Sequence, residues 1–270
     1  MLRLRVITAL AMFAGIVSAV VWLDTRGLAL ALGAVILVGA WEWGALSGLG
    51  DPGARITYVA AIAVLALAMV NYLPDTVLLA TGCLWWTLVV LRILRGHPSA
   101  PLQGRISHAW LLAGPLTLLP AYSAILYLHR SDAFGAVFLL YAMCIVFIAD
   151  IGAYFTGRRW GRRKLVAKIS PGKTWEGAAG ALALVAAYGV VGGWWFATTL
   201  NGAALLVVVV VAAGLVSIVG DLFESLLKRA AQRKDSGNLL PGHGGVLDRI
   251  DSLTAAMPIV AFGVHMLPVT

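Results

Sequence analysis

Hydrophobic residues run through the chain in nine long blocks separated by short polar stretches. Each block approaches the length of about 20 residues that an α-helix needs to cross the apolar part of a bilayer. A segment in lipid must satisfy its own backbone hydrogen bonds, as a helix does. The pattern predicts an all-α, polytopic integral membrane bundle of about nine transmembrane helices. They are expected at 6–23, 27–46, 56–73, 76–94, 108–128, 133–155, 176–196, 200–220 and 252–270.

Composition favours a membrane protein over a soluble or disordered chain. Hydrophobic residues make up 61% of the 270 residues and charged residues 12%, with a mean hydropathy of +0.91. Soluble domains carry about 25% charged residues, and disordered chains lack this hydrophobicity. Because no polar domain follows the first apolar run, a membrane helix is favoured there over a signal peptide. Cys83 and Cys144 lie in apolar runs and suggest neither a metal site nor a disulfide.

Positive charges predict the orientation. If the N-terminus is cytoplasmic, only Arg26 and Arg130 of the 20 Lys and Arg residues fall outside, in line with the positive-inside rule. Two long basic loops, after the sixth and eighth helices, are then cytoplasmic. We expect a bacterial inner membrane protein whose net charge of +8 reflects these loops, not nucleic acid. Residues 1–130 are expected to hold the N-terminal helices. Residues 131–270 are expected to hold the C-terminal helices with catalytic loops, in one integral unit.

Seven of the twelve acidic residues lie in or beside the two loops, a placement that topology does not require. They are Asp150, Glu176, Asp221, Glu224, Asp235, Asp248 and Asp251. Asp150 is either an interfacial carboxylate or a functional group. Asp248 and Asp251 are three residues apart, so both face one side of a helix. The pair suits Mg²⁺, which takes one or two carboxylates and fills its shell with water and phosphate oxygens. The alternative is charge stabilisation of a helix start.

Basic and glycine-rich stretches beside these acids suit phosphate binding. Ser170, Lys173 and Thr174 precede a predicted helix, where hydroxyl groups can donate to phosphate oxygens. A Walker loop is not favoured, because Ala167 occupies the place of its first glycine. The run 234–245 is rich in glycine, so its backbone NH groups can approach phosphates closely. His243 within it could serve as a phosphate donor, a base or a bystander.

Another charged group follows helical spacing. Asp221, Glu224 and Lys228 recur at intervals of three and four residues, with Arg229 next in the chain. Several of them can therefore share a helix face, although weak surface ion pairs would show the same spacing. Carboxylates for a metal, cations for anionic oxygens and glycine-rich backbone together indicate phosphoryl or nucleotidyl transfer. The many membrane segments imply that one substrate is a lipid.

The stretch from Ser225 to Asp251 resembles the signature of the phosphatidate cytidylyltransferase (CDP-diacylglycerol synthase) family. The matching residues are Ser225, Leu227, Lys228, Arg229, Lys234, Asp235, Gly237, Leu240, Pro241, His243, Gly244, Gly245, Val246, Asp248, Arg249, Ile250 and Asp251. The stretches 150–155 and 170–177 also resemble the family, with Gly172 at a position where lysine is frequent. The motifs cover roughly the C-terminal half of the chain.

The resemblance implies a reaction in which CTP and phosphatidate give CDP-diacylglycerol and pyrophosphate. The expected cofactor is Mg²⁺ or another divalent cation. The expected catalytic residues are Asp221, Lys228, Arg229, His243, Asp248, Arg249 and Asp251. The expected substrate-binding residues are Ser170, Lys173, Thr174, Ser225, Gly244 and Gly245. The expected metal ligands are Asp150, Asp221, Asp248 and Asp251.

Other functions share parts of this pattern. A lipid kinase or another CTP-dependent lipid enzyme shares the chemistry, but the complete signature argues against it. A transporter would place ionisable groups near the bilayer centre, and here Glu42 is the main acid within an apolar run. A structural scaffold is a further alternative. The expected partners are CTP, phosphatidate and membrane lipids, with no nucleic acid, and a homodimer is left open.

Overall fold

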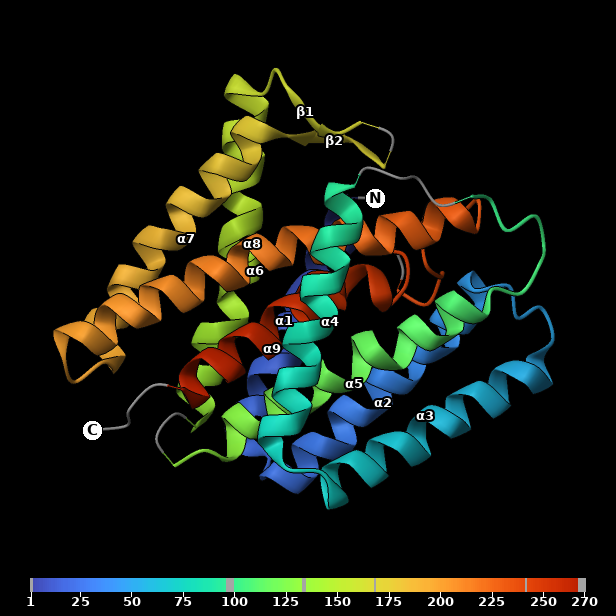
Figure 1. Ribbon diagram of the computed structural model, residues 1–270, viewed down its shortest axis with the longest axis horizontal. Helices are drawn as coiled ribbons and strands as arrows, with labels where there is room; N and C mark the ends of the chain where they lie inside the picture. Colours follow the sequence, from blue (N-terminus) through green and yellow to red (C-terminus); the bar gives the residue numbers. More distant parts are fainter. Residues whose placement is uncertain (1, 96–99, 133–134, 168, 241, 267–270) are drawn as a thin grey trace.

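The computed structural model describes residues 2–95, 100–132, 135–167, 169–240 and 242–266. These ranges hold nine helices and one short antiparallel hairpin (Figure 1). The helices are α1 (Leu2–Trp22), α2 (Thr25–Leu46), α3 (Pro52–Tyr72), α4 (Asp75–Leu94), α5 (His108–Arg130), α6 (Gly135–Trp160), α7 (Trp175–Phe196), α8 (Leu200–Ala230) and α9 (Leu247–His265). The strands are β1 (Lys164–Val166) and β2 (Ser170–Thr174). Signature residue Pro241 and parts of two expected segments, 133–134 and 267–270, lie outside the described residues.

A helix covers each of the nine expected segments within the described part of the chain, so the helical membrane bundle is confirmed. Seven of these helices, α2 to α8, are long and apolar enough to cross a membrane. The apolar part of α1, Ile7–Trp22, is shorter. The number of crossings and the side on which the N-terminus lies therefore stay predictions.

Three features differ from the expected pattern. Helix α8 continues past residue 220 to Ala230, because Leu222, Phe223, Leu226 and Leu227 prolong its buried face between the charged residues. Helix α9 begins at Leu247, ahead of the expected 252, so Asp248 and Asp251 both lie on the helix. The hairpin was not expected in an all-α chain; it pairs Lys164 with Thr174 and Val166 with Ser170.

Short polar side chains set where several helices begin. Asp24, Asp51, Thr174 and Thr199 each precede a helix, and each accepts a hydrogen bond from the backbone NH three residues later, at 2.8–3.1 Å. Such caps satisfy one of the NH groups that a helix start leaves without a partner. The polar residues between the apolar blocks thus determine where the next helix begins, in addition to making the turns polar.

Helix α9 lies at the centre of the bundle and contacts α4, α5, α6 and α8 (Figure 1). It crosses α8 at Gly220, where an added Cβ would lie 2.7 Å from the backbone oxygen of Asp251. Only glycine allows this approach. The crossing brings the next residue of α8, Asp221, next to Asp251 of α9.

An aromatic cluster holds α8 against the N-terminal helices. Phe223 on α8 has four tryptophan rings around it at centroid distances of 5.2–6.1 Å, from Trp43, Trp85, Trp86 and Trp110. Trp43 and Trp86 are buried almost completely. Because aromatic residues bury large areas and pack in tilted or edge-to-face pairs, this cluster fixes the position of the charged part of α8.

Candidate active site

The hairpin is fastened to the start of α7. The carboxylate of Glu176 accepts hydrogen bonds from the backbone NH groups of Arg162 (3.1 Å) and Arg163 (3.2 Å), and Thr174 caps the helix. Thr174 is buried and also lines a pocket with Lys173, and its substrate-binding role stays a prediction. The basic loop after α6 is therefore ordered around the strand that carries Lys173.

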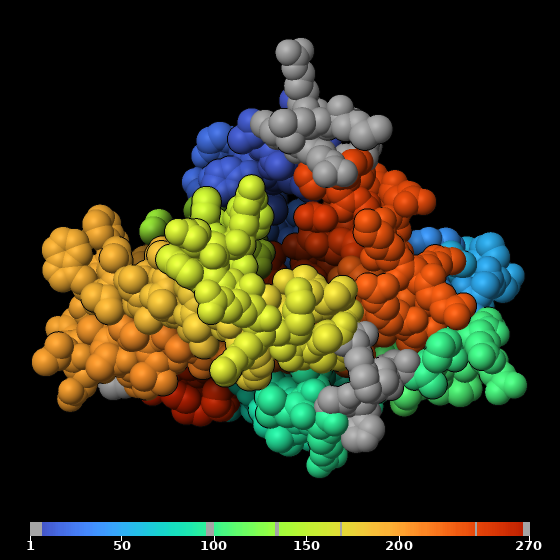
Figure 2. Space-filling model, turned by 90° about the horizontal axis from the view of Figure 1, so that it is seen from above, coloured from blue at the N-terminus to red at the C-terminus, as the bar shows by residue number. Residues whose placement is uncertain are grey.

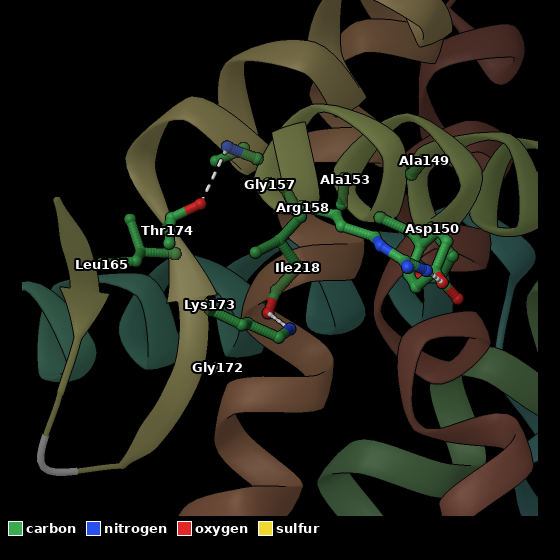
Figure 3. Close-up of a pocket in the computed structure, with 13 residues that line it drawn as sticks. Ala149, Asp150, Ala153, Gly157, Arg158, Leu165, Gly172, Lys173, Thr174 and Ile218 are labelled. Atoms are coloured by element: carbon green, nitrogen blue, oxygen red, sulfur yellow. Dashed lines mark hydrogen bonds between the residues drawn. The ribbon is translucent and has the colours of Figure 1, made fainter. Parts of the chain in front are cut away.

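Lys173 projects from β2 onto α8 (Figure 3). Its Nζ lies 2.7 Å from Asp221 Oδ2 and 3.4 Å from the backbone oxygen of Ile218. Asp150 on α6 interacts electrostatically with Lys173 and Asp221. Asp150, Lys173 and Arg158 line one pocket of about 490 Å³ between α6, the hairpin and α8. Two motifs that the sequence separates by tens of residues thus meet at one place.

Asp221 and Asp251 form the acidic part of the site. Ser225 Oγ donates to Asp221 Oδ1 at 3.3 Å, and the backbone NH of Ser252 donates to Asp251 Oδ1 at 2.7 Å. The pKa of Asp251 is raised, first by removal from water and then by the negative charge of Asp221. A buried carboxylate with a second carboxylate beside it forms a place where a bound cation would be stabilised.

Asp248 has a different environment from Asp251. Its Oδ1 lies 2.6 Å from Lys228 Nζ, and its Oδ2 accepts from Ser236 N (2.9 Å), Ser236 Oγ (2.9 Å) and Gly245 N (2.8 Å). Although burial opposes ionisation, these donors hold the pKa of Asp248 below its usual range. Lys228 also lies 2.6 Å from the buried Glu224. Asp248 and Lys228 therefore bind the glycine-rich loop to α8, a role that the sequence did not reveal.

Glu42 is the site residue that sequence reasoning missed. It is buried in α2, and its oxygens accept from Ser236 Oγ (3.0 Å), Val246 N (3.0 Å) and Leu247 N (2.9 Å). Val246 precedes α9 and its own side chain provides no cap. Glu42 thus caps α9 from about 200 residues away in sequence and holds the same serine as Asp248. The sequence signal for this role was the position of Glu42 inside an apolar run, since buried acidic residues are rare and usually have a structural or functional role.

The loop between α8 and α9 forms a second, polar pocket. Gly244 adopts φ +83 and pairs with Leu240, which folds the loop back on itself. Arg249 donates through Nη2 to the backbone oxygen of His243 at 2.7 Å, and the His243 ring lies 2.9 Å from Thr8 Oγ1 on α1. The pocket has a volume of about 600 Å³. It is lined by Lys234, Asp235, Asn238, Leu240, Gly242, His243, Gly244 and Arg249.

Figure 2 shows a hollow at this end of the molecule. The end of α6 and the hairpin lie on one side of it, the loop between α8 and α9 lies on the other, and red α9 atoms are visible within it. Most expected site residues come together here. Ser170 pairs with Val166 at the start of β2, Arg229 is exposed on the last turn of α8, and neither lines the two pockets. The catalytic, substrate-binding and metal-binding roles of all the expected site residues stay predictions, including those of Ser170 and Arg229.

The donor set was compared with the needs of Mg²⁺. Within the described residues, no three His, Cys, Asp or Glu side chains form a ready metal cage. Mg²⁺ needs only one or two carboxylates, because water and phosphate oxygens complete its shell. Asp221 and Asp251 fit this need, with Asp150 nearby, whereas both oxygens of Asp248 already accept protein hydrogen bonds.

The whole chain has known relatives. It matches the cytidylyltransferase family over residues 3–267. A Pseudomonas aeruginosa protein named phosphatidate cytidylyltransferase is 43% identical over 97% of this chain and 96% of its own length. Proteins of the same name from Haemophilus influenzae and Brucella suis are 36% and 34% identical, over 97% and 96% of this chain and 98% and 92% of their own lengths. The N-terminal helices, whose motifs were weak, are thus covered as well, and the chain belongs to the cytidylyltransferase family.

Proposed function

We propose that the protein transfers the cytidylyl group of CTP to phosphatidate, giving CDP-diacylglycerol and pyrophosphate. One observation carries the proposal. Lys173 from the hairpin, Asp221 from α8 and Asp251 from α9 converge at one end of a membrane bundle, where Lys173 lines a pocket together with Asp150 and Arg158. Full-length relatives carry the name of this activity. A site for a nucleotide and a lipid phosphate needs both this polarity and this access to the bilayer.

The reaction joins two anions. A phosphate oxygen of phosphatidate attacks the α-phosphorus of CTP, the new P–O bond forms, and the bond from the α-phosphorus to the bridging oxygen breaks as pyrophosphate leaves. The attacking phosphate is already ionised, so no general base is needed. Lys173 contacts Asp221, and both Lys173 and Arg249 interact electrostatically with Asp150, so the two cations supply positive charge at the acidic residues. Catalysis of this kind consists of positioning and charge neutralisation.

Asp221 and Asp251 are the residues that would hold Mg²⁺, with Asp150 as a further carboxylate. When bound, the ion neutralises phosphate charge and stabilises the leaving group. Lys228, Asp248 and Glu42 act one step away from the substrates, since they hold the loop from Ser236 to Gly245 in place. Lys228 was expected to be a catalytic residue; we propose that it is needed for activity as a positioning residue instead.

The protein is an integral membrane protein, and we place the site at the cytoplasmic face of a bacterial inner membrane. The positive-inside rule supports this orientation, because residues 158–173 and 228–249 together carry 12 of the 20 Lys and Arg residues. Because CTP is highly charged, it cannot cross the bilayer unaided and must reach the site from the cytoplasm. Phosphatidate, by contrast, can reach the same pockets from within the membrane.

Pyrophosphate release tests the proposal. The purified protein in detergent is given CTP, phosphatidate and Mg²⁺, and each component is omitted in turn. We expect release only with all three, together with a CDP-diacylglycerol product of matching amount. Release with CTP and Mg²⁺ alone would indicate nucleotide hydrolysis. No release from a folded protein would refute the proposed activity.

A further inference from the structure

An apolar cavity of about 410 Å³ lies beside the polar pocket, where α1, α2, α5 and α9 meet. Its volume falls within the range of about 300–1,000 Å³ typical of small-molecule sites. Nearly all of its lining is aliphatic, and Arg249 is the one charged residue among the lining residues described. We call it the acyl groove. Its lining includes Gly15, Ile16, Leu28, Val35, Ile125 and Leu253.

The acyl groove adjoins the polar pocket. Leu240 and Arg249 line both cavities. The guanidinium of Arg249 has five NH donors, and its Nε and Nη2 donate to the backbone oxygen of His243. This anchors the cation at the boundary and leaves further donors for an anionic group. An apolar cavity with an arginine at one end suits an amphiphile that has a hydrocarbon chain and a phosphate.

The groove is open on one side and closed at depth. Gly15 and Ile16 on α1 and Val35 on α2 are exposed, so the cavity reaches the surface between these two helices. Val20 and Leu28 at the other end are buried. A lipid in the surrounding bilayer can therefore slide in sideways between α1 and α2 without leaving an apolar environment.

We propose that the acyl groove holds one acyl chain of phosphatidate, which enters between α1 and α2 and places its phosphate beside Arg249. This inference rests on the proposed function, because it assigns a subsite to its lipid substrate. The shared residues Leu240 and Arg249 are the argument for this occupant over a bulk lipid. A chain of a bulk lipid would fill the groove without any need for the adjoining cation and polar pocket.

Gly15→Leu tests the groove. Nothing lies within 4 Å of a Cβ at Gly15, so the new side chain can extend into the cavity without a backbone clash. Since a helix rises about 1.5 Å per residue, Gly15 lies roughly 10 Å further along α1 than Thr8, which contacts His243. A leucine there shortens the groove below the length of a long chain but leaves its polar end open.

Gly33→Leu on α2 is the matched control. A Cβ at Gly33 also meets nothing within 4 Å, and Gly33 does not line the groove. Both changes raise helix propensity by a similar amount. Ala31→Leu, on the α2 wall of the groove, is a second test variant should Gly15→Leu fail to fold.

The assay compares kcat/KM for dioctanoyl and dipalmitoyl phosphatidate in mixed micelles at equal surface concentration. We expect Gly15→Leu to lower the dipalmitoyl value about tenfold relative to the dioctanoyl value, because several methylenes lose their buried site. Gly33→Leu should leave the ratio unchanged. An unchanged ratio in both groove variants, an equal loss for both lipids, or an equal shift in the control would overturn the groove assignment. If the wild-type protein transferred cytidylyl to neither lipid, the proposed function itself would fail, which is a distinct result.

Discussion

Replacing Glu42 by alanine should destabilise the loop before α9 and lower activity, although we expect Glu42 itself to contact no substrate. The carboxylate accepts from three donors, Ser236 Oγ, Val246 N and Leu247 N, at 2.9–3.0 Å. Ser236 keeps Asp248 as an acceptor. The two backbone NH groups lose their acceptor, and an unsatisfied buried donor costs about 1–3 kcal/mol. The expected loss is therefore about 2–6 kcal/mol for the pair, less where water enters the space.

Thermal unfolding in detergent and limited trypsin cleavage measure this loss. Glu42→Ala should unfold at lower temperature and be cleaved faster after Arg233 and Lys234, in the loop that Glu42 holds. Glu42→Gln should have an unfolding temperature and a cleavage rate between those of Glu42→Ala and the wild type. Its amide oxygen can accept from one donor, but its NH₂ group opposes the other. Asp51→Ala is the control, since it removes an exposed helix cap away from the site and should cost only about 1 kcal/mol.

The reasoning about Glu42 makes a further distinction. Because Glu42 reaches the substrates only through the loop, Glu42→Ala should lower pyrophosphate release even at temperatures where the protein is still folded. Wild-type unfolding, cleavage and turnover in Glu42→Ala would refute the role of this side chain.

Three further predictions concern the acidic site. Asp248→Asn should lose most metal-dependent turnover while the protein stays folded, because Lys228 loses one of its two carboxylate partners and the loop loses its charged acceptor; near-normal pyrophosphate release would contradict this. Gly220→Ala should cost about 1–3 kcal/mol in thermal unfolding and lower activity, since its Cβ would press on Asp251 and Ala255, whereas Gly33→Ala should lower neither stability nor activity. Removal of divalent cations by a chelator should stop the reaction, and added Mg²⁺ should restore it; full activity in chelator would remove the metal from the mechanism.

Local sequence determined the elements and the chemistry. Apolar blocks of membrane-spanning length leave a chain few options besides helices, because backbone groups in lipid have no water to bond. The helices accordingly follow the blocks, and short polar residues such as Asp51 and Thr174 begin them. The signature from Ser225 to Asp251 was also sufficient to indicate the family, which the comparisons over the full chain confirmed.

Only the tertiary structure decided what each charged residue does. Asp248 and Asp251 are three residues apart and share one face of α9. Asp248 nevertheless binds Lys228 and the loop before α9, while Asp251 lies beside Asp221. Helical periodicity gives the face on which a residue lies but not what it meets there.

The partners of these residues come from distant parts of the chain, which explains why the sequence alone did not assign them. Glu42 caps a helix about 200 residues away, and Lys173 reaches Asp221 from a hairpin that an apolar pattern does not encode. The sequence by itself thus determined a helical membrane bundle with the residues for cytidylyl transfer. Their division into substrate-facing and loop-holding groups depends on helix crossings such as that at Gly220, where packing across the bundle sets the distances.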